Sequence, residues 1–443
     1  MSLRESNEHP ASRTTPKFRL SCKPLVLPPQ PDVTATLPLR PLRPLAFIEL
    51  FDPTRADTGV RPYEEGNPST FDPYLSYPPP MRVGLTVSSN KFTGAAAVAE
   101  HWCRALHAAG NEARLLFVAG DNLEYRLSGS SWALPGLSKE HRLSDVRANL
   151  QALRHLATWA NIVITFLPHD HLESVIAGAH RRAPLIRAFR NPRHLRHDPL
   201  HRWIIRRCAA ALAPFESLVP RTGVLIGGHP VESIPVPVED RFRPGLNARE
   251  SRGLLGIDPE IPVIGMVGKL AAGRGFKTLL DAAAGARTQC RILAVGHGEE
   301  QPFLEQQARD LGISDRITWA GKREHDLPLL LDAMDAVVFA APGSDWGHRA
   351  ISEAQACARP VITRPIAGVE DLVQEEISGI IAEDSQGIAN AFDRLIENPK
   401  LGLRLGQGAS EAVADRRFNT IGRRLTAVLE EFSSLDRSPE RRN

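Results

Sequence analysis

The chain has 443 residues, of which 42% are hydrophobic and 24% are charged, as is usual for a soluble globular protein. A formal net charge of +3 is too small to indicate nucleic acid as a partner. No apolar run reaches the roughly 18 residues of a membrane-spanning helix. Since single cores stop growing at about 250–300 residues, we expect two domains.

The five cysteines are scattered and include no CxxC pair. Such spacing indicates neither a disulfide framework nor a zinc site, and it favours a reducing cytoplasm. The N-terminus also lacks the apolar segment of a signal peptide.

Residues 1–80 contain 16 of the 36 prolines and show no sustained hydrophobic periodicity. Because proline disfavours helix and removes backbone donors, we predict a largely disordered extension. A strand-like apolar run begins directly after Met81, so Met81 is a candidate natural start. N-terminal sequencing of the native protein would test this hypothesis.

Residues 81–240 alternate between strand-like and helix-like patterns, which predicts an N-terminal domain with a parallel sheet. The expected strands cover 82–88, 113–118, 161–166 and 184–189, and the expected helices cover 95–109 and 146–159.

Two segments of this domain are candidates for substrate contact. Gly94, after Thr93, opens the first helix, where backbone N–H groups favour an anion. His169, Asp170 and His171 follow a predicted strand, but no Cys or HxxxH partner accompanies them, so we expect no metal site. We favour an acceptor-side position for His169.

Residues 180–207 carry nine arginines and a single acid, Asp198. Trp203, Ile204 and Ile205 lie between Arg202 and the pair Arg206 and Arg207, a pattern that suits an amphipathic helix. Three interpretations remain open: a solvated basic face, a site for an anionic acceptor, and a docking surface for anionic lipid headgroups. The third would place the protein peripherally at the inner membrane face.

The segment 234–244 is rich in proline and charge, which is typical of a linker, and we expect a C-terminal domain at 241–415. A helix at 416–434 is expected to pack back on the N-terminal domain, followed by a tail at 435–443. Together these patterns predict two doubly wound, Rossmann-like α/β domains that face each other across a cleft.

In the C-terminal part the expected strands cover 263–267, 291–295, 316–319, 335–341, 360–363 and 379–382, and the expected helices cover 276–286, 300–311, 327–334, 385–397 and about 402–433.

Two glycine-containing turns follow predicted strands of the C-terminal domain. Gly268 and Lys269 begin the first, and Arg274 lies five positions after Lys269 at the start of a helix. Two cations near a helix start suit a diphosphate, although a glycine turn with solvated basic residues is the alternative. Gly296 opens the second turn, which by itself indicates only a tight strand-to-helix connection.

Two carboxylates, Asp345 and Glu353, lie eight positions apart across a predicted strand–turn–helix corner. Corners of this kind bind ligands in parallel α/β sheets. The two acids are therefore candidates for binding the hydroxyls of a sugar and a ribose.

The order of these motifs resembles the GT-B glycosyltransferases, specifically glycosyltransferase family 4, from about Met81 to Phe432. The resemblance implies that Lys269 and Arg274 hold the donor diphosphate, that Glu353 binds the nucleotide ribose and that Asp345 approaches the donor sugar. The motifs that carry it are Val267-Gly268-Lys269-Leu270, Arg274-Gly275-Phe276, Leu293-Ala294-Val295-Gly296-His297-Gly298-Glu299 and Glu353-Ala354.

The resemblance also implies that the backbone N–H groups from Trp346 to Arg349, across Gly347 and His348, face the sugar and diphosphate. The chain departs from the family pattern at three positions. Asp345 stands where glutamate is usual, Lys269 where arginine is usual, and Arg190 where a histidine near the acceptor is usual.

The resemblance implies a nucleotide-sugar-dependent glycosyltransferase that retains anomeric configuration and requires no metal or cofactor. Its acceptor would be a glycan, a lipid-linked sugar or a small molecule, as in polysaccharide biosynthesis. Two other functions remain open: a non-catalytic sugar-nucleotide binding or assembly protein, and a nucleotide-sugar 2-epimerase.

Overall fold

A computed structural model describes residues 79–140, 142–189, 203–245, 247–341, 348–366 and 368–436. By its internal contacts the chain divides into Met1–Ser76 and Tyr77–Asn443, and all the described residues belong to the second unit. The prediction of a disordered extension at 1–80 therefore falls almost entirely outside the described residues.

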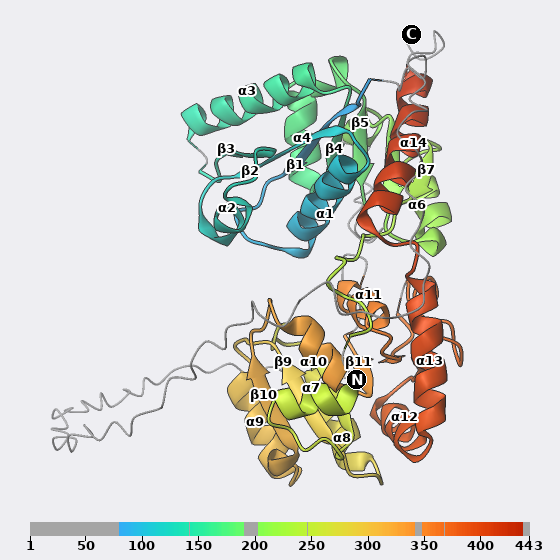
Figure 1. The fold of residues 1–443 in the computed structure, drawn as a ribbon. Helices are drawn as coiled ribbons and strands as arrows, with labels where there is room; N and C mark the ends of the chain where they lie inside the picture. Colours follow the sequence, from blue (N-terminus) through green and yellow to red (C-terminus); the bar gives the residue numbers. More distant parts are fainter. Residues whose placement is uncertain are drawn as a thin grey trace, which may run out of the picture. The chain divides into compact units, whose positions relative to one another are not determined.

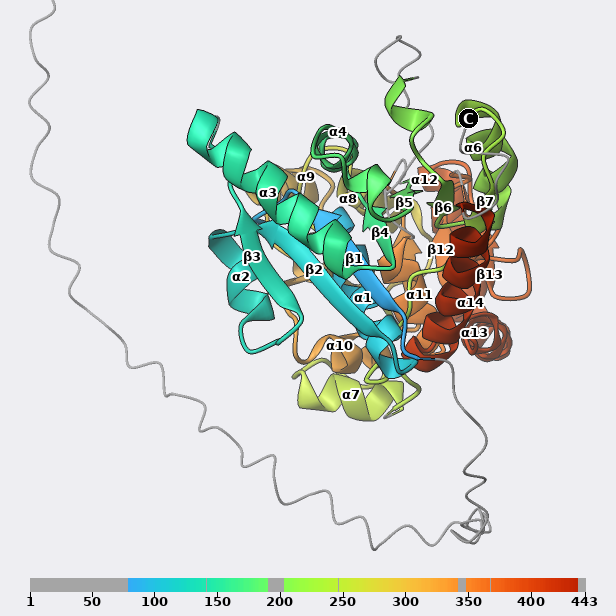
Figure 2. The same ribbon diagram turned by 90° about the horizontal axis from the view of Figure 1, so that it is seen from above.

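The first domain is built on a seven-stranded parallel sheet with the order β3-β2-β1-β4-β5-β6-β7, which can be followed in Figure 2. The central strands β1, β4, β5 and β6 are short and almost fully buried, as expected when helices cover both faces of a parallel sheet, whereas the edge strands β3 and β7 are more exposed. The strands are β1 (Arg82–Val87), β2 (Glu112–Val118), β3 (Ala133–Leu137), β4 (Ile162–Thr165), β5 (Leu185–Ala188), β6 (Ala210–Ala213) and β7 (Val231–Ser233).

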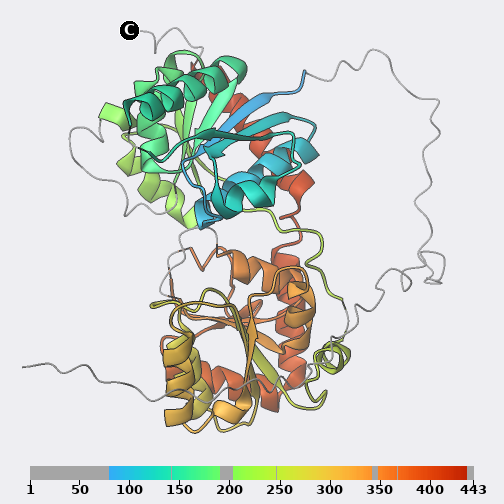
Figure 3. The same ribbon diagram turned by 90° about the vertical axis from the view of Figure 1, so that its left-hand side faces the viewer.

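Helices lie on both faces of this sheet (Figure 3). On one face Leu85 and Leu115 pack in a core with α1 and the C-terminal helix α14, and on the other Leu116 packs with Leu153 and Leu156 of α3. The helices are α1 (Gly94–Ala108), α2 (Asp121–Leu127), α3 (Leu143–Trp159), α4 (Pro168–Ile176), α6 (Val219–Leu225) and α14 (Phe418–Asp436).

The second domain has a six-stranded parallel sheet with the order β10-β9-β8-β11-β12-β13. Its strands are β8 (Val263–Val267), β9 (Arg291–Val295), β10 (Ile317–Gly321), β11 (Ala336–Phe339), β12 (Val361–Thr363) and β13 (Gly379–Ile381). Its helices are α7 (Ala248–Leu254), α8 (Phe276–Gly285), α9 (Gln301–Asp310), α10 (Leu327–Ala333), α11 (Arg349–Ala356), α12 (Ser385–Glu397) and α13 (Pro399–Ala412).

Both sheets reverse their winding direction at one point. The reversal lies between β1 and β4 in the first domain and between β8 and β11 in the second. In doubly wound sheets, ligands bind outside the carboxyl ends of the strands at such switch points. The predicted fold of two doubly wound α/β domains is confirmed.

The structure differs from the expected elements at the C-terminus. The single helix expected from about 402 to 433 is two helices, α13 and α14, because the chain becomes irregular at 413–417, where Val238 donates its backbone N–H to Arg416 O at 2.8 Å. The helix α14 then packs along α1 (Figure 1).

Several short elements were missed by pattern reading. The edge strand β3 contains Pro135 and Gly136, residues that normally signal a turn. The helices α2, α6 and α7 span only seven residues each, too few for a helical period to stand out. Within the described residues, no helix combines the length and the apolar character needed to cross a bilayer.

Candidate functional site

The carboxyl end of β8 carries the two predicted phosphate-binding cations. Lys269 follows the strand in the β8–α8 turn, and Arg274 precedes the N-cap of α8. That N-cap, Gly275, has φ 89°, and a Cβ there would lie 2.5 Å from the backbone carbon of Ala340. Only glycine fits this position, so the helix start that follows Arg274 is held against the loop after β11.

The turn after β9 interlocks with the turn after β8. Gly268 donates its backbone N–H to Val295 O at 2.9 Å, and Leu270 donates to His297 O at 3.1 Å. Gly296 has φ 147°, and a Cβ there would stand 1.7 Å from Gly268 O. The structure therefore brings the predicted glycines Gly268 and Gly296 into direct backbone contact.

This contact sets Lys269 opposite Glu299. The Lys269 Nζ lies 2.8 Å from Glu299 Oε2 and 3.0 Å from Oε1, and both side chains are exposed. The hydrogen bond from Lys269 lowers the pKa of the Glu299 carboxyl. Arg274 is also exposed, but its guanidinium has no hydrogen bond or ion pair with any residue in the described part of the chain.

Glu353 lies on α11, which follows β11 at the other side of the switch point. The residue is only 4% exposed, and its Oε1 lies 2.9 Å from Arg349 Nε, one helical turn earlier. Burial raises the pKa of the Glu353 carboxyl, although the nearby Arg349 charge acts in the opposite direction. The predicted ribose-binding acid is thus a buried carboxylate with one cationic partner.

His348 is the N-cap of α11 and adopts a left-handed conformation, φ 43° and ψ 51°. It is buried, with its ring centroid 5.3 Å from that of Phe339 at the end of β11. Because this conformation costs a non-glycine residue about 1–2 kcal/mol, packing must hold the chain in place at the start of the helix. Two other predicted residues of this corner, Asp345 and Gly347, lie outside the described residues.

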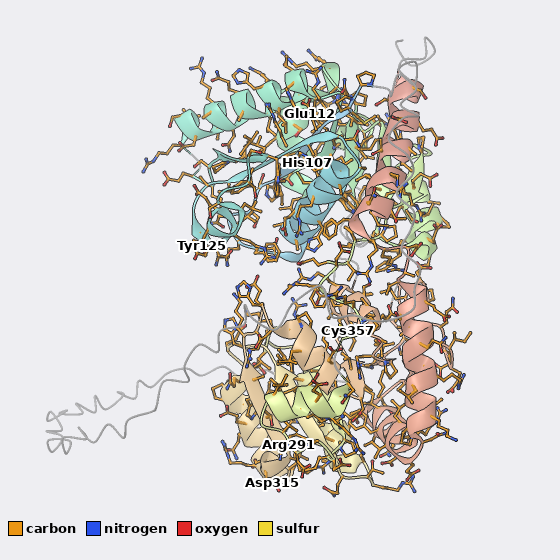
Figure 4. The ribbon with its side chains drawn as sticks, viewed as in Figure 1. His107, Glu112, Tyr125, Arg291, Asp315 and Cys357 are labelled. Atoms are coloured by element: carbon orange, nitrogen blue, oxygen red, sulfur yellow. The ribbon has the colours of Figure 1, made fainter. Side chains whose placement is uncertain are left out.

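All these residues follow the carboxyl ends of neighbouring parallel strands, so they share one edge of the C-terminal sheet. The opposite edge is marked in Figure 4 by Arg291, the first residue of β9, and by Asp315, just before β10. The switch point therefore collects Lys269, Arg274 and Glu353 on the edge where ligands bind in such sheets.

In the N-terminal domain, Gly94 and His169 follow the adjacent strands β1 and β4. Gly94 begins α1, whose N-cap Thr93 accepts the Ala96 N–H at 3.4 Å. The His169 side chain is 53% exposed, with Nε2 3.4 Å from Ser88 O. These two predicted residues share the carboxyl edge of their sheet, and the third, Arg190, lies outside the described residues.

The other two members of the His-Asp-His triplet face inward. Asp170 is fully buried and accepts the N–H groups of Ser88 at 2.8 Å and Leu167 at 2.7 Å, which ties the loop after β1 to α4. His171 Nδ1 lies 2.9 Å from Thr165 Oγ1, and burial, followed by the Arg187 charge, lowers its pKa to about 3. Among the described residues, no group of three or more His, Cys, Asp or Glu is placed to hold a metal ion.

Sequence reasoning missed two charged residues of these corners. Glu299 ends a glycine-containing turn, and the sequence pattern does not mark it as a partner of Lys269. The signal is that Glu299 follows β9 and Lys269 follows β8, because these two strands pair in the sheet. Arg187 interrupts the apolar strand β5, and its guanidinium donates to Thr165 O at 3.2 Å and Leu167 O at 2.6 Å. A charge inside a buried strand is the signal that could have identified it.

The segment that carries these residues matches a known protein family. Residues 261–398, which include Lys269, Arg274 and Glu353, match the model of the family described as Glycosyl transferases group 1. In its fold the chain is similar to Anabaena Alr3699/HepE, solved in complex with UDP and glucose, with a TM-score of 0.68 and 20% identity over 79% of this chain and all of that one. The fold is GT-B.

Other solved GT-B structures agree. The sucrose-phosphate synthase of Thermosynechococcus elongatus aligns with a TM-score of 0.66 and 15% identity, over 80% of this chain and 99% of that one. WaaG, a glycosyltransferase involved in lipopolysaccharide biosynthesis, aligns with a TM-score of 0.57 and 14% identity, over 78% and 99%.

Curated relatives share part of the sequence. The alpha-D-kanosaminyltransferase of Streptomyces kanamyceticus is 25% identical over 251 residues, which are 53% of this chain and 64% of the relative. A D-inositol 3-phosphate glycosyltransferase of Frankia alni is 32% identical over 185 residues, or 38% and 45%. The chain thus spans 45–64% of the length of these two relatives.

Proposed function

We propose that this protein is a glycosyltransferase that moves a sugar from a nucleotide-sugar donor to a hydroxyl group of an acceptor. The observation that carries the proposal is the convergence of Lys269, Arg274 and Glu353 at the switch point of the C-terminal sheet. All three lie in the segment, 261–398, that resembles group 1 glycosyltransferases. We call these three residues the donor site.

Each residue of the donor site has a role that its chemistry supports. Lys269 and Arg274 are exposed cations in the β8–α8 turn, and Arg274 lies at the start of α8, where the helix dipole also favours an anion. They would therefore neutralise the charge that develops on the leaving diphosphate. Glu353 offers a carboxylate that accepts hydrogen bonds from the two ribose hydroxyls. We assign Asp345 to the donor sugar and the N–H groups near Gly347, His348 and Arg349 to the sugar and diphosphate.

We further propose that transfer proceeds with retention and without a metal ion. The bond between the anomeric carbon and the phosphate oxygen breaks, and the acceptor oxygen bonds to the same face of the sugar. The acceptor proton passes to the departing phosphate, so no protein nucleophile is needed. An NMR assignment of the product anomer tests retention, and transfer measured with and without EDTA tests the absence of a metal requirement.

The acceptor is proposed to bind at the carboxyl edge of the N-terminal sheet, on the side of His169 and Arg190, whereas Gly94 at the start of α1 is assigned to the donor. The names of the relatives point to hydroxyl-rich acceptors: an inositol phosphate for the Frankia protein and a lipopolysaccharide core for LpsE of Rhizobium meliloti. We therefore propose a glycan, a lipid-linked sugar or a small polyol as the acceptor class.

We further propose that the protein is cytoplasmic and that residues 180–207 contact an anionic membrane surface. Such contact would hold the protein close to a lipid-linked acceptor. In its described part, the Arg207 guanidinium lies 3.8 Å from the centre of the Trp203 ring, and Trp203 is 44% exposed. Cosedimentation with anionic vesicles, but not with neutral ones, is the expected result.

The activity is tested by a screen of UDP-, GDP- and ADP-sugars for binding, hydrolysis and transfer. Replacing Lys269 or Glu353 by alanine should reduce transfer by at least about 100-fold, as loss of a transition-state contact typically does. Full activity in both variants would refute the donor site.

The same screen separates the other two functions. Binding without turnover on any acceptor would favour a sugar-nucleotide binding protein. Conversion of a UDP-sugar by the protein alone would favour a 2-epimerase.

A further inference from the structure

The ion pair between Lys269 and Glu299 is built into two adjoining turns. Besides the contact of Leu270 with His297, Glu300 donates its backbone N–H to Leu270 O at 3.0 Å. A Cβ at Gly298 would lie 2.2 Å from that same carbonyl oxygen, so a larger residue would separate the turns. The backbone therefore keeps the two charged side chains opposite each other although both are exposed.

The two cations of the donor site consequently differ in the free protein. The Lys269 ammonium contacts both carboxylate oxygens of Glu299, at 2.8 and 3.0 Å, whereas the Arg274 side chain has no partner among the described residues. A carboxylate oxygen and a phosphate oxygen offer an ammonium the same kind of charge-assisted hydrogen bond. A diphosphate that reaches Lys269 must therefore replace Glu299 or share the lysine with it, next to a second negative charge.

From this arrangement we infer that Glu299 is an internal competitor of the donor diphosphate for the Lys269 ammonium, and so tunes the affinity for the nucleotide. The inference rests on the proposed function, because it requires a diphosphate at Lys269. In the same way, Glu299 recovers Lys269 once the sugar has been transferred. This exchange weakens the hold on the nucleoside diphosphate product and favours its release.

The size of the effect follows from the exposure of the pair. Exposed ion pairs at a protein surface stabilise by an amount that corresponds to about a two- to fivefold change in an equilibrium constant. Since Glu299 also repels the incoming anion, we expect its neutralisation to strengthen nucleotide binding by about that factor.

The experiment compares the wild-type protein with Glu299→Gln by calorimetry, using UDP, GDP and ADP at low ionic strength. We expect Glu299→Gln to bind the preferred nucleotide about two- to fivefold more tightly, and the gain to shrink in about 0.5 M salt because the pair is screened. In a Lys269→Met background most of this gain should disappear, because no ammonium is left to compete for and only the weaker repulsion between Glu299 and the diphosphate is removed. Equal or weaker binding by Glu299→Gln, or an undiminished gain in that background, would overturn the inference.

Glu260→Gln is the matched control. Glu260 forms an exposed pair with Arg249 at 2.8 Å, and it precedes β8, at the opposite edge of the same sheet. This control changes the net charge by the same amount as Glu299→Gln but far from Lys269, so nucleotide affinity should stay unchanged. An equal gain in affinity for Glu260→Gln would show that net charge alone causes the effect, and it would overturn the inference. If wild-type protein binds none of the three nucleotides, the proposed function itself fails. Binding by wild type without a gain in Glu299→Gln contradicts only the role of Glu299.

Discussion

Two glutamates that follow strands of the C-terminal sheet, Glu353 and Glu299, occupy opposite environments. Glu353 is buried, and desolvation raises the pKa of its carboxyl even though Arg349 lies beside it. Glu299 is exposed, and its hydrogen bond with Lys269 lowers the pKa of its carboxyl. At neutral pH a folded protein therefore gains from the charge on Glu299 and pays a free-energy penalty for the charge on Glu353.

We predict that Glu353→Gln abolishes transfer but raises the melting temperature at neutral pH. The folded pKa of Glu353 lies above that of the unfolded chain, so between the two values the folded state binds more protons and stability falls as pH rises. The gain should be full above the folded pKa and should vanish below about pH 4, where the carboxyl is protonated in both states.

Thermal denaturation between pH 4 and pH 8 measures this difference. Glu299→Gln is the control with the opposite sign, because the lowered pKa of Glu299 means that its charge adds stability above the unfolded pKa. A lower melting temperature for Glu353→Gln at neutral pH would show that the pair with Arg349 outweighs the burial of the charge.

At the scale of a single element, the helix α14 depends on a glycine for its close approach to α1. A Cβ at Gly422 would lie 1.9 Å from Ala105 O and 3.0 Å from the Cβ of Ala109. One turn further along, Thr426 Oγ1 accepts a hydrogen bond from Asn111 Nδ2 at 2.7 Å. At Gly422 the two helices therefore approach so closely that no side chain fits between them.

Gly422→Val should destabilise the protein by about 1–3 kcal/mol, since overpacking forces the helices apart. Gly402→Ala in α13 is the matched control, because no atom lies within 4 Å of its added Cβ and alanine should stabilise that helix by up to about 1 kcal/mol. Urea denaturation followed by circular dichroism measures both. A Gly422→Val protein as stable as wild type would contradict the close packing.

At the scale of the whole molecule, one hydrophobic core joins distant parts of the chain. Four buried side chains of α14 lie in the same cluster as residues of β1, α1 and β2. These side chains are Ile421, Leu425, Leu429 and Phe432, each at most 1% exposed. The N-terminal core is therefore completed by a segment that the chain supplies only after the C-terminal sheet is finished.

A protein truncated after Asp415 should lose cooperative folding of its N-terminal sheet. Burial of a large apolar side chain stabilises by about 1.5–3 kcal/mol, so four of them contribute about 6 kcal/mol or more. That amount is comparable with the total stability of a typical domain, about 5–15 kcal/mol.

Denaturation of the truncated protein and the addition of a synthetic 416–436 peptide test this prediction. The peptide should bind and restore the lost transition. A truncated protein that unfolds in the same two-state manner as the full chain, at the same urea concentration, would refute it.

Much of the fold follows from local pattern. Runs such as Val263–Val267 and Ala336–Phe339 are apolar and short, and amphipathic segments separate them, so the α/β class and the parallel sheets could be predicted. The positions of Lys269, Arg274 and Glu353 after strands could be read in the same way. Pattern reading failed for β3, where proline and glycine stand in an edge strand, and for the short helices α2, α6 and α7.

The sequence by itself determined which residues follow which strands, because the periodicity of apolar residues is a local property of the chain. Only the tertiary structure decided which other residues they contact. The pairing of Lys269 with Glu299, the burial of Glu353 beside Arg349 and the inward turn of Asp170 and His171 all depend on strand order and on contacts between distant segments. These arise from close packing over the whole domain, which the spacing of residues along the chain does not encode.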